Sequence, residues 1–407
     1  MARRESAAAG PGSRALVVDL IRSSGPISRV ELVKATGLTQ PTISNIVRRL
    51  IDDGVVRETG DTVATRGKPR TLLVINSRAA YGVGIHLGDS TLTCVVTDTR
   101  GGTVGRQLVA APAGTGPADL TDALADLYRD VTRGLGLPPR SVAGMAVVGP
   151  GPVDVVRGDF LAPGRRPAEQ GLARELSERL AVPVLVDSDA SAATVGEFWG
   201  RQVSRERTFG CLYMNAGIGS GVVLDGSLHR GASSNAGKVG HVAVVRDGEP
   251  CPCGNRGCLE QYAAPHVLAA RARTVPGLAD RLRIRPDDPA DRAFDVLARA
   301  AVYGDEDARA LLDEAADLLA DGALTLVNLW DLDTLVLAGP GFAVAGSLYV
   351  AAIRRRLGER ACTREVHAVD VGLSSNPRDS AAIGGAALVL QGSVAPGHGP
   401  LVAARAG

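Results

Sequence analysis

Hydrophobic residues near the N-terminus recur at the spacing of α-helices. Residues 14–23 form a short apolar segment, and a Gly-Pro pair ends it because proline cannot continue a helix. Ser28 and Glu31 stand three positions apart, as in a capping box, and Gly37 is placed to end the helix that they begin. After a short turn a third helix begins at Gln40. Its apolar positions share one face that we expect to be buried: Ile43, Ile46, Val47, Leu50 and Ile51.

The opposite face of this third helix is polar and suits contact with DNA. Near its N-terminus, where a recognition helix reaches base edges, stand Gln40, Thr42, Ser44 and Asn45. Arg48 and Arg49 follow, and their charges suit phosphates. Two strands at 55–60 and 70–75 form a hairpin, the expected wing, with three basic residues at or near its tip: Arg66, Lys68 and Arg70. We predict a winged helix-turn-helix domain over residues 13–78 that binds double-stranded DNA; a three-helix packing domain without a DNA role is the alternative.

From about Tyr81 the chain alternates between strands and helices, with many glycines at the turns. The expected elements are two strands around Gly88, a buried strand within 141–154, a strand running into a helix over 182–200, a hairpin over 207–226, a strand within 332–341 and a closing helix over 380–392. This pattern predicts an α/β fold in two lobes. We expect residues 79–196 with 376–391 in the first lobe, 197–375 in the second, and mobile tails at 1–12 and 392–407.

The composition is that of a globular protein. The chain has 407 residues, of which 45% are apolar and 22% charged, and this length allows two or three packed domains. Its apolar runs are far shorter than the roughly 20 residues of a membrane-spanning helix, and the N-terminus has no hydrophobic segment that could serve as a secretory signal. We expect a cytoplasmic protein.

Charge is distributed unevenly along the chain. Residues 1–78 hold thirteen Lys and Arg against seven Asp and Glu, a net charge of +6, so the remaining 329 residues carry −5 of the total of +1. A basic N-terminal part on an acidic body indicates that this part meets a polyanion. A solvated charged surface is the alternative.

Half of the six cysteines fall within eight positions. Cys251, Cys253 and Cys258 follow His241, which we expect on the preceding strand. In a reducing cytosol such a cluster indicates metal or redox chemistry rather than disulfides. One imidazole and three thiolates form a tetrahedral set that prefers zinc to magnesium or calcium and leaves no open position, so the expected Zn2+ is structural. A redox dithiol or chance clustering are the alternatives. The other cysteines are expected in the core: Cys94, Cys211 and Cys362.

An ordered set of motifs resembles the ROK family of sugar kinases and transcriptional repressors. In chain order they are a glycine turn after the first body strand, VVGPGPVD, VDSDASAA, NAGIGSG, GKVGH, CPCGNRGCLE and LVLAGPG, over roughly residues 80–390. The pair GKVGH and CPCGNRGCLE is the most specific part. The resemblance implies an actin-like, ribonuclease H-like sugar-kinase body of two lobes, and the preceding winged helix is similar to the family's repressor branch.

The resemblance also implies the same four zinc ligands and a sugar pocket that the metal loop orders. In that pocket His241 and Glu260 would touch the sugar, and Asp189 matches the family's catalytic base, which can still accept a hydrogen bond from a sugar hydroxyl. The family's neighbouring asparagine is Ser188 here, and the glutamate of its GExGH motif is Lys238. These five residues are the expected ligand-binding set.

Two departures from the family add positive charge near this pocket. The family's APN turn appears as residues 162–164 with the sequence APG, followed by Arg165 and Arg166, and Lys238 replaces a carboxylate. Lys238 could neutralise Asp189 and Glu260, because buried charges are normally paired. Alternatively, the pocket could take an anionic ligand such as a sugar phosphate or a sugar acid. Both interpretations remain open at this point.

The ATP site that the resemblance implies is degenerate. Family kinases carry D-x-G-G-T after the first strand, whereas this chain has HLGDS at 86–90. His86 replaces the first carboxylate, Asp89 replaces the second glycine and would repel phosphate, and Ala216 replaces the usual threonine of the second phosphate loop. We therefore expect a protein that is not an enzyme.

The function predicted from these features is that of a DNA-binding transcriptional regulator, a repressor whose kinase-like body senses a sugar or sugar derivative without phosphorylating it. Expected partners are an operator duplex, the effector and further copies of the chain in a homodimer or tetramer. An active sugar kinase with a regulatory head is the alternative, and a ligand-blind DNA-binding or scaffolding protein is a third. Closure of the lobes on a ligand would change how paired subunits hold their heads.

Overall fold

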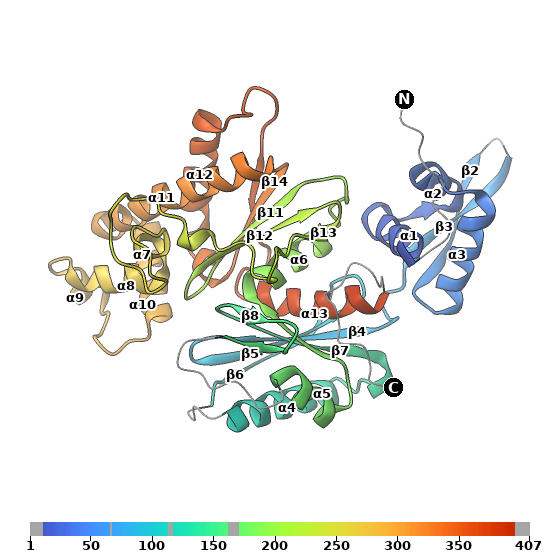
Figure 1. The fold of residues 1–407 in the computed structure, drawn as a ribbon, viewed down its shortest axis with the longest axis horizontal. Helices are drawn as coiled ribbons and strands as arrows, with labels where there is room; N and C mark the ends of the chain where they lie inside the picture. The colour runs from blue at the N-terminus through green and yellow to red at the C-terminus, as the bar shows by residue number, and fades with distance from the viewer. Residues whose placement is uncertain (1–10, 66, 113–116, 162–170, 395–407) are drawn as a thin grey trace.

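The computed structural model describes residues 11–65, 67–112, 117–161 and 171–394, and it shows a small N-terminal head beside a two-lobed body (Figure 1). The head consists of α1 (Pro11–Ser24), β1 (Ile27–Ser28), α2 (Arg29–Thr36), α3 (Gln40–Asp52), β2 (Val56–Thr65) and β3 (Gly67–Ile75). Its three strands form a sheet in the order β1-β3-β2. The predicted order of three helices and a hairpin is confirmed.

Local sequence signals fix the helices of the head. Ser28 and Glu31 form the predicted capping box, since Ser28 N donates to Glu31 Oε2 at 2.8 Å and Glu31 N donates to Ser28 Oγ at 3.4 Å. Gly37 ends α2 with φ of 69°, a conformation that favours glycine. The apolar stripe of α3 packs inward against α2, α1 and β2, with Ile43, Val47 and Leu50 fully buried and Ile46 and Ile51 partly buried.

The first lobe is a five-stranded mixed sheet in the order β10-β7-β4-β5-β6. Its strands are β4 (Tyr81–Leu87), β5 (Thr91–Asp98), β6 (Thr103–Ala110), β7 (Val142–Gly149) and β10 (Val184–Ser188). Helices α4 (Pro117–Gly134) and α5 (Leu172–Leu180) cover one face, and α13 (Ser380–Val394) covers the other (Figure 1). The short elements are η1 (Pro139–Ser141), β8 (Val153–Asp154) and β9 (Asp159–Phe160).

The second lobe is a five-stranded sheet in the order β13-β12-β11-β14-β15 with a helical layer. Its strands are β11 (Phe209–Met214), β12 (Ile218–Leu224), β13 (Ser227–Leu228), β14 (Thr334–Ala338) and β15 (Asp370–Leu373). Its helices are η2 (Val239–His241), α7 (Glu260–Ala263), α8 (Pro265–Thr274), α9 (Leu278–Leu282), α10 (Ala290–Val302), α11 (Glu306–Trp330), η3 (Pro340–Phe342) and α12 (Gly346–Arg360).

Helix α6 (Asp189–Gly200) lies with α13 between the two sheets (Figure 1). One buried cluster joins side chains of β7, α6, β11, β14 and α13, so the lobes share a core at this place. Glycines allow α6 and α13 to touch backbone to backbone. A Cβ on Gly196 would stand 2.8 Å from the Cα of Gly384, and one on Gly384 would overlap the carbonyl of Ala192. Helix α6 is thus held tightly along its length.

Three expectations need correction. His241 lies in the 3-10 helix η2 and not on a strand, because the chain turns there toward the cysteine loop. Cys362 is exposed, since it follows the buried C-cap residue Ala361 beyond the end of α12. Residues 11–12 and 392–394, which we assigned to tails, are helical. Among the described residues, no helix combines the length and apolarity that crossing a membrane requires.

Candidate functional site

The polar face of α3 is open to solvent. Thr39 caps the helix, and its hydroxyl forms a hydrogen bond with that of Thr42 at 2.9 Å. Gln40, Asn45, Arg48 and Arg49 are exposed, whereas Thr42 and Ser44 are half-buried. The face is therefore available to a duplex, and Thr42 is partly engaged in holding the start of the helix.

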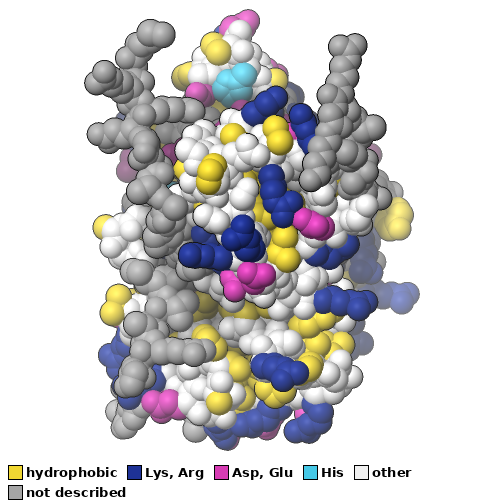
Figure 2. Space-filling view, turned by 90° about the vertical axis from the view of Figure 1, so that its right-hand side faces the viewer, with side chains coloured by type: hydrophobic (Ala, Val, Ile, Leu, Met, Phe, Trp, Pro, Cys, Tyr) yellow, Lys and Arg dark blue, Asp and Glu magenta, His cyan; other side chains and the backbone are white. Residues whose placement is uncertain are grey.

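The expected wing is the hairpin of β2 and β3. Arg70 is half-buried on β3, Arg66 lies outside the described residues, and Lys68 belongs to β3 by its backbone. An ion pair of 2.9 Å between Arg29 and Glu58 ties α2 to β2. The space-filling view from the head side shows more Lys and Arg than Asp and Glu side chains on this face (Figure 2). The view includes part of the body as well as the head.

The four predicted zinc ligands come together in one cluster. The ligand atoms of His241, Cys251, Cys253 and Cys258 all lie within 4.8 Å of one another. Cys251 Sγ is 3.6 Å from His241 Nδ1, and Cys253 Sγ is 3.8 Å from Cys258 Sγ. For Zn–S bonds of about 2.3 Å, tetrahedral geometry places ligand sulfurs about 3.8 Å apart. The donor set and its spacing therefore fit Zn2+, held by Nδ1 of the histidine and three thiolates.

The loop that carries the thiols is shaped by glycine. Gly254 and Gly257 have φ of 94° and 71°, and a Cβ on Gly257 would overlap the carbonyl of Val245. Cys258 ends the loop at the start of α7, whose first residue is Glu260. A metal bound here would thus fix both His241 and Glu260, which belong to the expected sugar pocket.

The expected pocket residues lie close to one another where the two lobes meet. Glu260 Oε2 accepts a hydrogen bond from Ile218 N at 2.8 Å, and Gly217 is close enough that a Cβ there would come within 2.5 Å of the same oxygen. Ser188 caps α6: its Oγ accepts from Ser191 N at 3.2 Å and donates to Ser191 Oγ at 2.9 Å. Ser188 therefore has a structural role that the sequence comparison did not indicate.

Asp189, the first residue of α6, is largely desolvated. Burial raises the pKa of its carboxyl to about 7, although the positive charge of Lys238 opposes the shift. His86 Nε2 lies 4.0 Å from Asp189 Oδ2 and 3.4 Å from Tyr213 Oη. Burial lowers the pKa of His86 to about 4, so this imidazole is neutral at pH 7 and the close approach to Asp189 is not an ion pair.

Lys238 lies among carboxylates and bridges the lobes. Its Nζ donates to the carbonyl oxygen of Gly151, in the loop after β7, at 3.3 Å. Burial lowers the pKa of Lys238, and the negative charges of Asp189, Asp187 and Glu260 oppose that shift. Asp187 is itself paired with Arg230 at 2.8 Å. The two cations, Lys238 and Arg230, therefore lie among three carboxylates, those of Asp187, Asp189 and Glu260. Residues 162–166 of the expected pocket lie outside the described residues.

Three residues of this region have no counterpart among the sequence predictions. Arg230 and Tyr213 are described above, and Asn235 holds the segment before Lys238 against the first lobe. Asn235 Oδ1 accepts from Val153 N at 2.8 Å, and its Nδ2 donates to Val153 O at 2.9 Å. These contacts join residues far apart in sequence, so no local pattern could have indicated them.

The glycines of NAGIGSG are explained by packing. A Cβ on Gly219 would stand 2.8 Å from the Cβ of Ala190, and one on Gly221 would overlap Thr194, so both allow β12 to lie against α6. The pKa of Asp89 is raised by desolvation and by the negative charge of Asp291, which His266 opposes. His266 Nδ1 lies 2.9 Å from the carbonyl oxygen of Ala216.

Comparison with known proteins agrees with this geometry. The model of the ROK family matches residues 82–392, which is more than half of the chain. The chain belongs to the ROK family. A second family model, winged helix-turn-helix DNA-binding, matches residues 16–57 of this ROK protein, so the head is confirmed as a winged helix.

Curated relatives of this ROK protein include regulators. A putative xylose repressor from Caldicellulosiruptor sp. is 26% identical over 386 residues, which cover 94% of this chain and 96% of the relative. The DNA-binding transcriptional dual regulator NagC of Escherichia coli is 27% identical over 330 residues, 80% of this chain and 79% of NagC.

Solved structures include both branches of the family. A ROK family transcriptional regulator described as a homologue of the E. coli MLC protein covers 95% of this chain and 97% of its own, with a TM-score of 0.74 and 23% identity. A ROK family glucokinase from Streptomyces griseus, solved with glucose and AMPPNP, covers 77% of this chain and 100% of its own, with a TM-score of 0.65 and 26% identity. The predicted fold, a winged head on an actin-like body, is confirmed.

Proposed function

We propose that this ROK protein is a transcriptional repressor that binds an operator duplex with its head and senses a sugar in the cleft of its body without phosphorylating it. The observation that carries the proposal is that one chain contains both a winged head and a ROK body. Over 93% of its length it is similar to a protein named xylose repressor from Caldicellulosiruptor bescii. We place this protein in the cytoplasm, where it can reach DNA.

Loss of phosphoryl transfer is supported by the chemistry of the cleft. A neutral His86 gives no negative charge to organise magnesium, and Asp89, close to Asp291, stands in place of a glycine of the family's phosphate-binding turn. The glycines that resemble a phosphate loop are needed for packing on α6 whether or not a nucleotide binds. The conformation of this loop therefore does not depend on bound ATP.

One observation favours the kinase as a second candidate. The pKa of about 7 at Asp189 suits a general base, which works best near the operating pH. The same carboxylate can accept a hydrogen bond from a sugar hydroxyl in a protein that only binds. The consumption of ATP separates the two candidates.

The balance of charge supports a neutral effector. Lys238 lies among three carboxylates and Arg230 Nη2 is paired with Asp187, so the two cations face an excess of negative groups, although Nη1 of Arg230 is buried without a hydrogen-bond partner among the described residues. The names of the relatives suggest the class to test first, namely D-xylose and N-acetylglucosamine. A structural Zn2+ at the four-ligand cluster would hold His241 and Glu260 in position for such a sugar.

The test uses the full-length protein and duplexes selected from a random pool. We expect enrichment of one sequence family and a change of at least tenfold in duplex affinity with D-xylose, D-glucose or N-acetylglucosamine. A dimer would read two half-sites about 34 Å apart or a multiple of that spacing, so the enriched sites should be palindromic. Incubation with ATP, magnesium and the same sugars should release no ADP above background. Steady, sugar-dependent ADP production would instead establish the kinase.

A further inference from the structure

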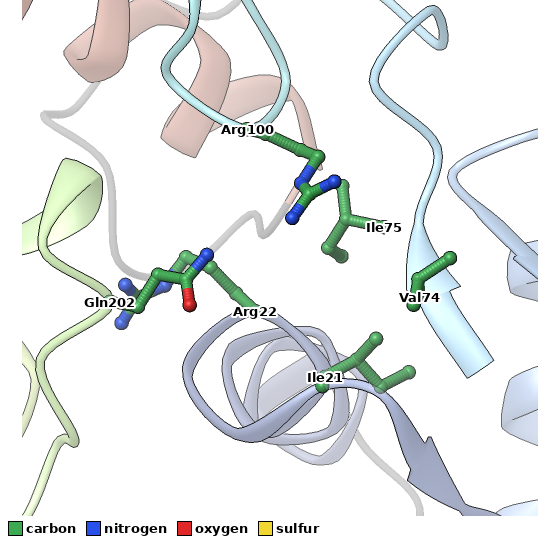
Figure 3. Close-up of a pocket in the computed structure, with 7 residues that line it drawn as sticks. Ile21, Arg22, Val74, Ile75, Arg100 and Gln202 are labelled. Carbon is green, nitrogen blue, oxygen red and sulfur yellow. The ribbon is translucent and has the colours of Figure 1, made fainter. Parts of the chain in front are cut away.

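Arg22 joins the DNA-binding head to the body. It lies in the last turn of α1 and is 5% exposed. Its Nη1 donates to the carbonyls of Phe198 and Trp199 at 3.4 and 3.1 Å, and its Nη2 donates to Val203 O at 3.0 Å. Figure 3 shows this side chain extending from α1 to the segment that carries Gln202.

The contact is specific to arginine. The guanidinium carbon lies 5.2 Å from the ring centre of Phe198 and 4.8 Å from that of Trp199, within the range of cation–π attraction. Asp19, one turn earlier on α1, accepts from Arg22 Nη2 at 2.7 Å and fixes the direction of the side chain. A planar group with several donors can satisfy three carbonyls at once, which an ammonium cannot do in the same geometry.

The carbonyls that Arg22 binds belong to the end of α6 and the turn that follows it. The carbonyls of Phe198 and Trp199 also accept backbone hydrogen bonds, from Val203 N at 3.2 Å and from Gln202 N at 3.1 Å, and they lie at the negative end of the helix dipole, where a buried cation is favoured. The first residue of the same helix is Asp189, one of the expected pocket residues. Twelve residues at 1.5 Å per residue make α6 about 18 Å long. One helix therefore runs from the expected sugar pocket to the anchor of the head.

Helix α6 is suited to transmit a displacement as a unit. It packs closely on α13 through Gly196 and Gly384, and nearly all its side chains are buried, so its neighbours restrict bending. Its end also touches the connection between head and body, since Trp199 Nε1 donates to Thr99 O at 3.4 Å and Thr99 N donates to Ser77 O at 3.3 Å. Movement at this end would reach the head at two places.

The boundary between head and body around Arg22 is incompletely packed. A small cavity is lined by Ile21, Arg22 and Gly25 from the α1 end, Val74 and Ile75 from β3, and Arg100 and Gln202 from the body (Figure 3). A boundary of this kind between head and body can open and close at a lower cost in free energy than a fully packed core. Arg22 is thus a polar anchor of the head beside the short connection that Thr99 contacts.

We propose that Arg22 is the residue through which α6 couples the sugar cleft to the DNA-binding head. The proposal rests on the proposed function as a sugar-sensing repressor. Because coupling is reciprocal, binding of a duplex at the head must change the end of α6, just as a ligand in the cleft must change the head. A residue that only fastens the head would stabilise the fold without carrying this effect.

Hydrogen exchange of the full-length protein tests the coupling with duplex DNA alone as the probe. The duplex is the one that the wild-type chain enriches from a random pool, added at a saturating concentration for each variant. We expect the exchange rates of the amides of residues 198–203 to change at least threefold in wild type, and less than 1.5-fold in Arg22→Gln. Arg14→Ala is the matched control, since Arg14 also lies on α1 but pairs at 3.0 Å with Asp53 inside the head; it should respond as wild type does.

A second variant, Arg22→Lys, keeps the test decisive if Arg22→Gln fails to fold. It keeps the charge and loses the planar fork, so we expect it to lose at least half of the wild-type response while its circular dichroism and thermal unfolding remain cooperative. The coupling is wrong if the Arg22 variants respond as strongly as Arg14→Ala does, or if the wild-type amides stay unchanged while the duplex is bound. A chain that enriches no duplex would instead contradict the proposed function, and the coupling would fall with it.

Discussion

Lys238 of the second lobe donates a hydrogen bond to the carbonyl oxygen of Gly151 in the first lobe, across 3.3 Å. The ammonium that makes this bond also lies among Asp187, Asp189 and Glu260. Lys238 therefore acts on the charge of the cleft and on the contact between the lobes together. Its position is best explained as that of a counter-ion, and the first prediction follows from this.

The native protein should bind a neutral sugar at least tenfold more tightly than the phosphate of that sugar. The physical reason is that Lys238 is already compensated, so an added phosphate would meet the remaining negative charge. Isothermal titration with N-acetylglucosamine, D-xylose and their phosphates measures this ratio. Tighter binding of a phosphate, lost on Lys238→Glu, would show that Lys238 recognises an anion.

Asp189→Asn should stabilise the protein at alkaline pH. The pKa of Asp189 is about 7 in the folded chain against an ordinary value of 3.8, so the folded state holds the proton more strongly. This stabilisation is complete below about pH 4 and is lost as pH rises toward and through 7. We expect the variant to gain about 1–3 kcal/mol in free energy of unfolding at pH 8 and much less at pH 5. Urea denaturation measures it, with exposed Glu206→Gln as control; equal gains at both pH values would contradict the prediction.

Arg49→Ala and Asn45→Ala should weaken DNA binding in different ways. Arg49 is expected to neutralise a phosphate, so its loss should weaken all duplexes alike and reduce the slope of log affinity against log salt by about 1. Asn45 is expected to reach a base, so its loss should cost about 1–3 kcal/mol of binding free energy and relax one operator position. Fluorescence anisotropy at several salt concentrations distinguishes the two. Arg174→Ala, on α5 of the body, is the control; a change of base preference in Arg49→Ala without a change of slope would reverse the assignments.

Cys258→Ser should release the bound metal and leave the overall fold intact. Cys258 is buried in the four-ligand cluster, and a large body does not depend on one metal loop for its core as a zinc finger does. Elemental analysis should find one zinc ion per chain in wild type and in Cys362→Ser, whose thiol is exposed and lies outside the cluster. Wild-type protein kept from chelators that holds less than a third of an ion per chain would rule the site out.

Gly221→Ala should destabilise the protein by about 1–3 kcal/mol, as overpacking does. The new methyl group would overlap the side chain of Thr194 where β12 meets α6. Gly372→Ala on β15, where nothing lies within 4 Å of the added carbon, is the matched control. Thermal unfolding without nucleotide measures the effect. If Gly221→Ala were as stable as the control, packing would not explain the glycines of NAGIGSG.

Local information in the sequence was sufficient for the head, the order of strands and helices, and the metal cluster. Ser28 and Glu31 lie three positions apart and cap the same helix. The buried stripe of α3 follows from the helical spacing of its apolar residues. Three thiols on one short loop lie close together because the loop is short. Such features depend on residues close together in the chain, so their spacing carries the information.

Tertiary structure decided the contacts between parts of the chain. Arg22 and the end of α6 are about 180 positions apart, Lys238 and Gly151 are 87 apart, and Arg230 and Asp187 are 43 apart. No pattern of residue types indicates which carbonyl or carboxylate an arginine will reach, because that depends on how the helices and sheets pack. Cys362 shows a related limit: cysteine is a residue type that is usually buried, but charged neighbours such as Arg360 and Arg364 and its place just beyond the end of α12 leave it exposed. Burial and partner are properties of the packed chain, and the sequence expresses them only through the whole fold.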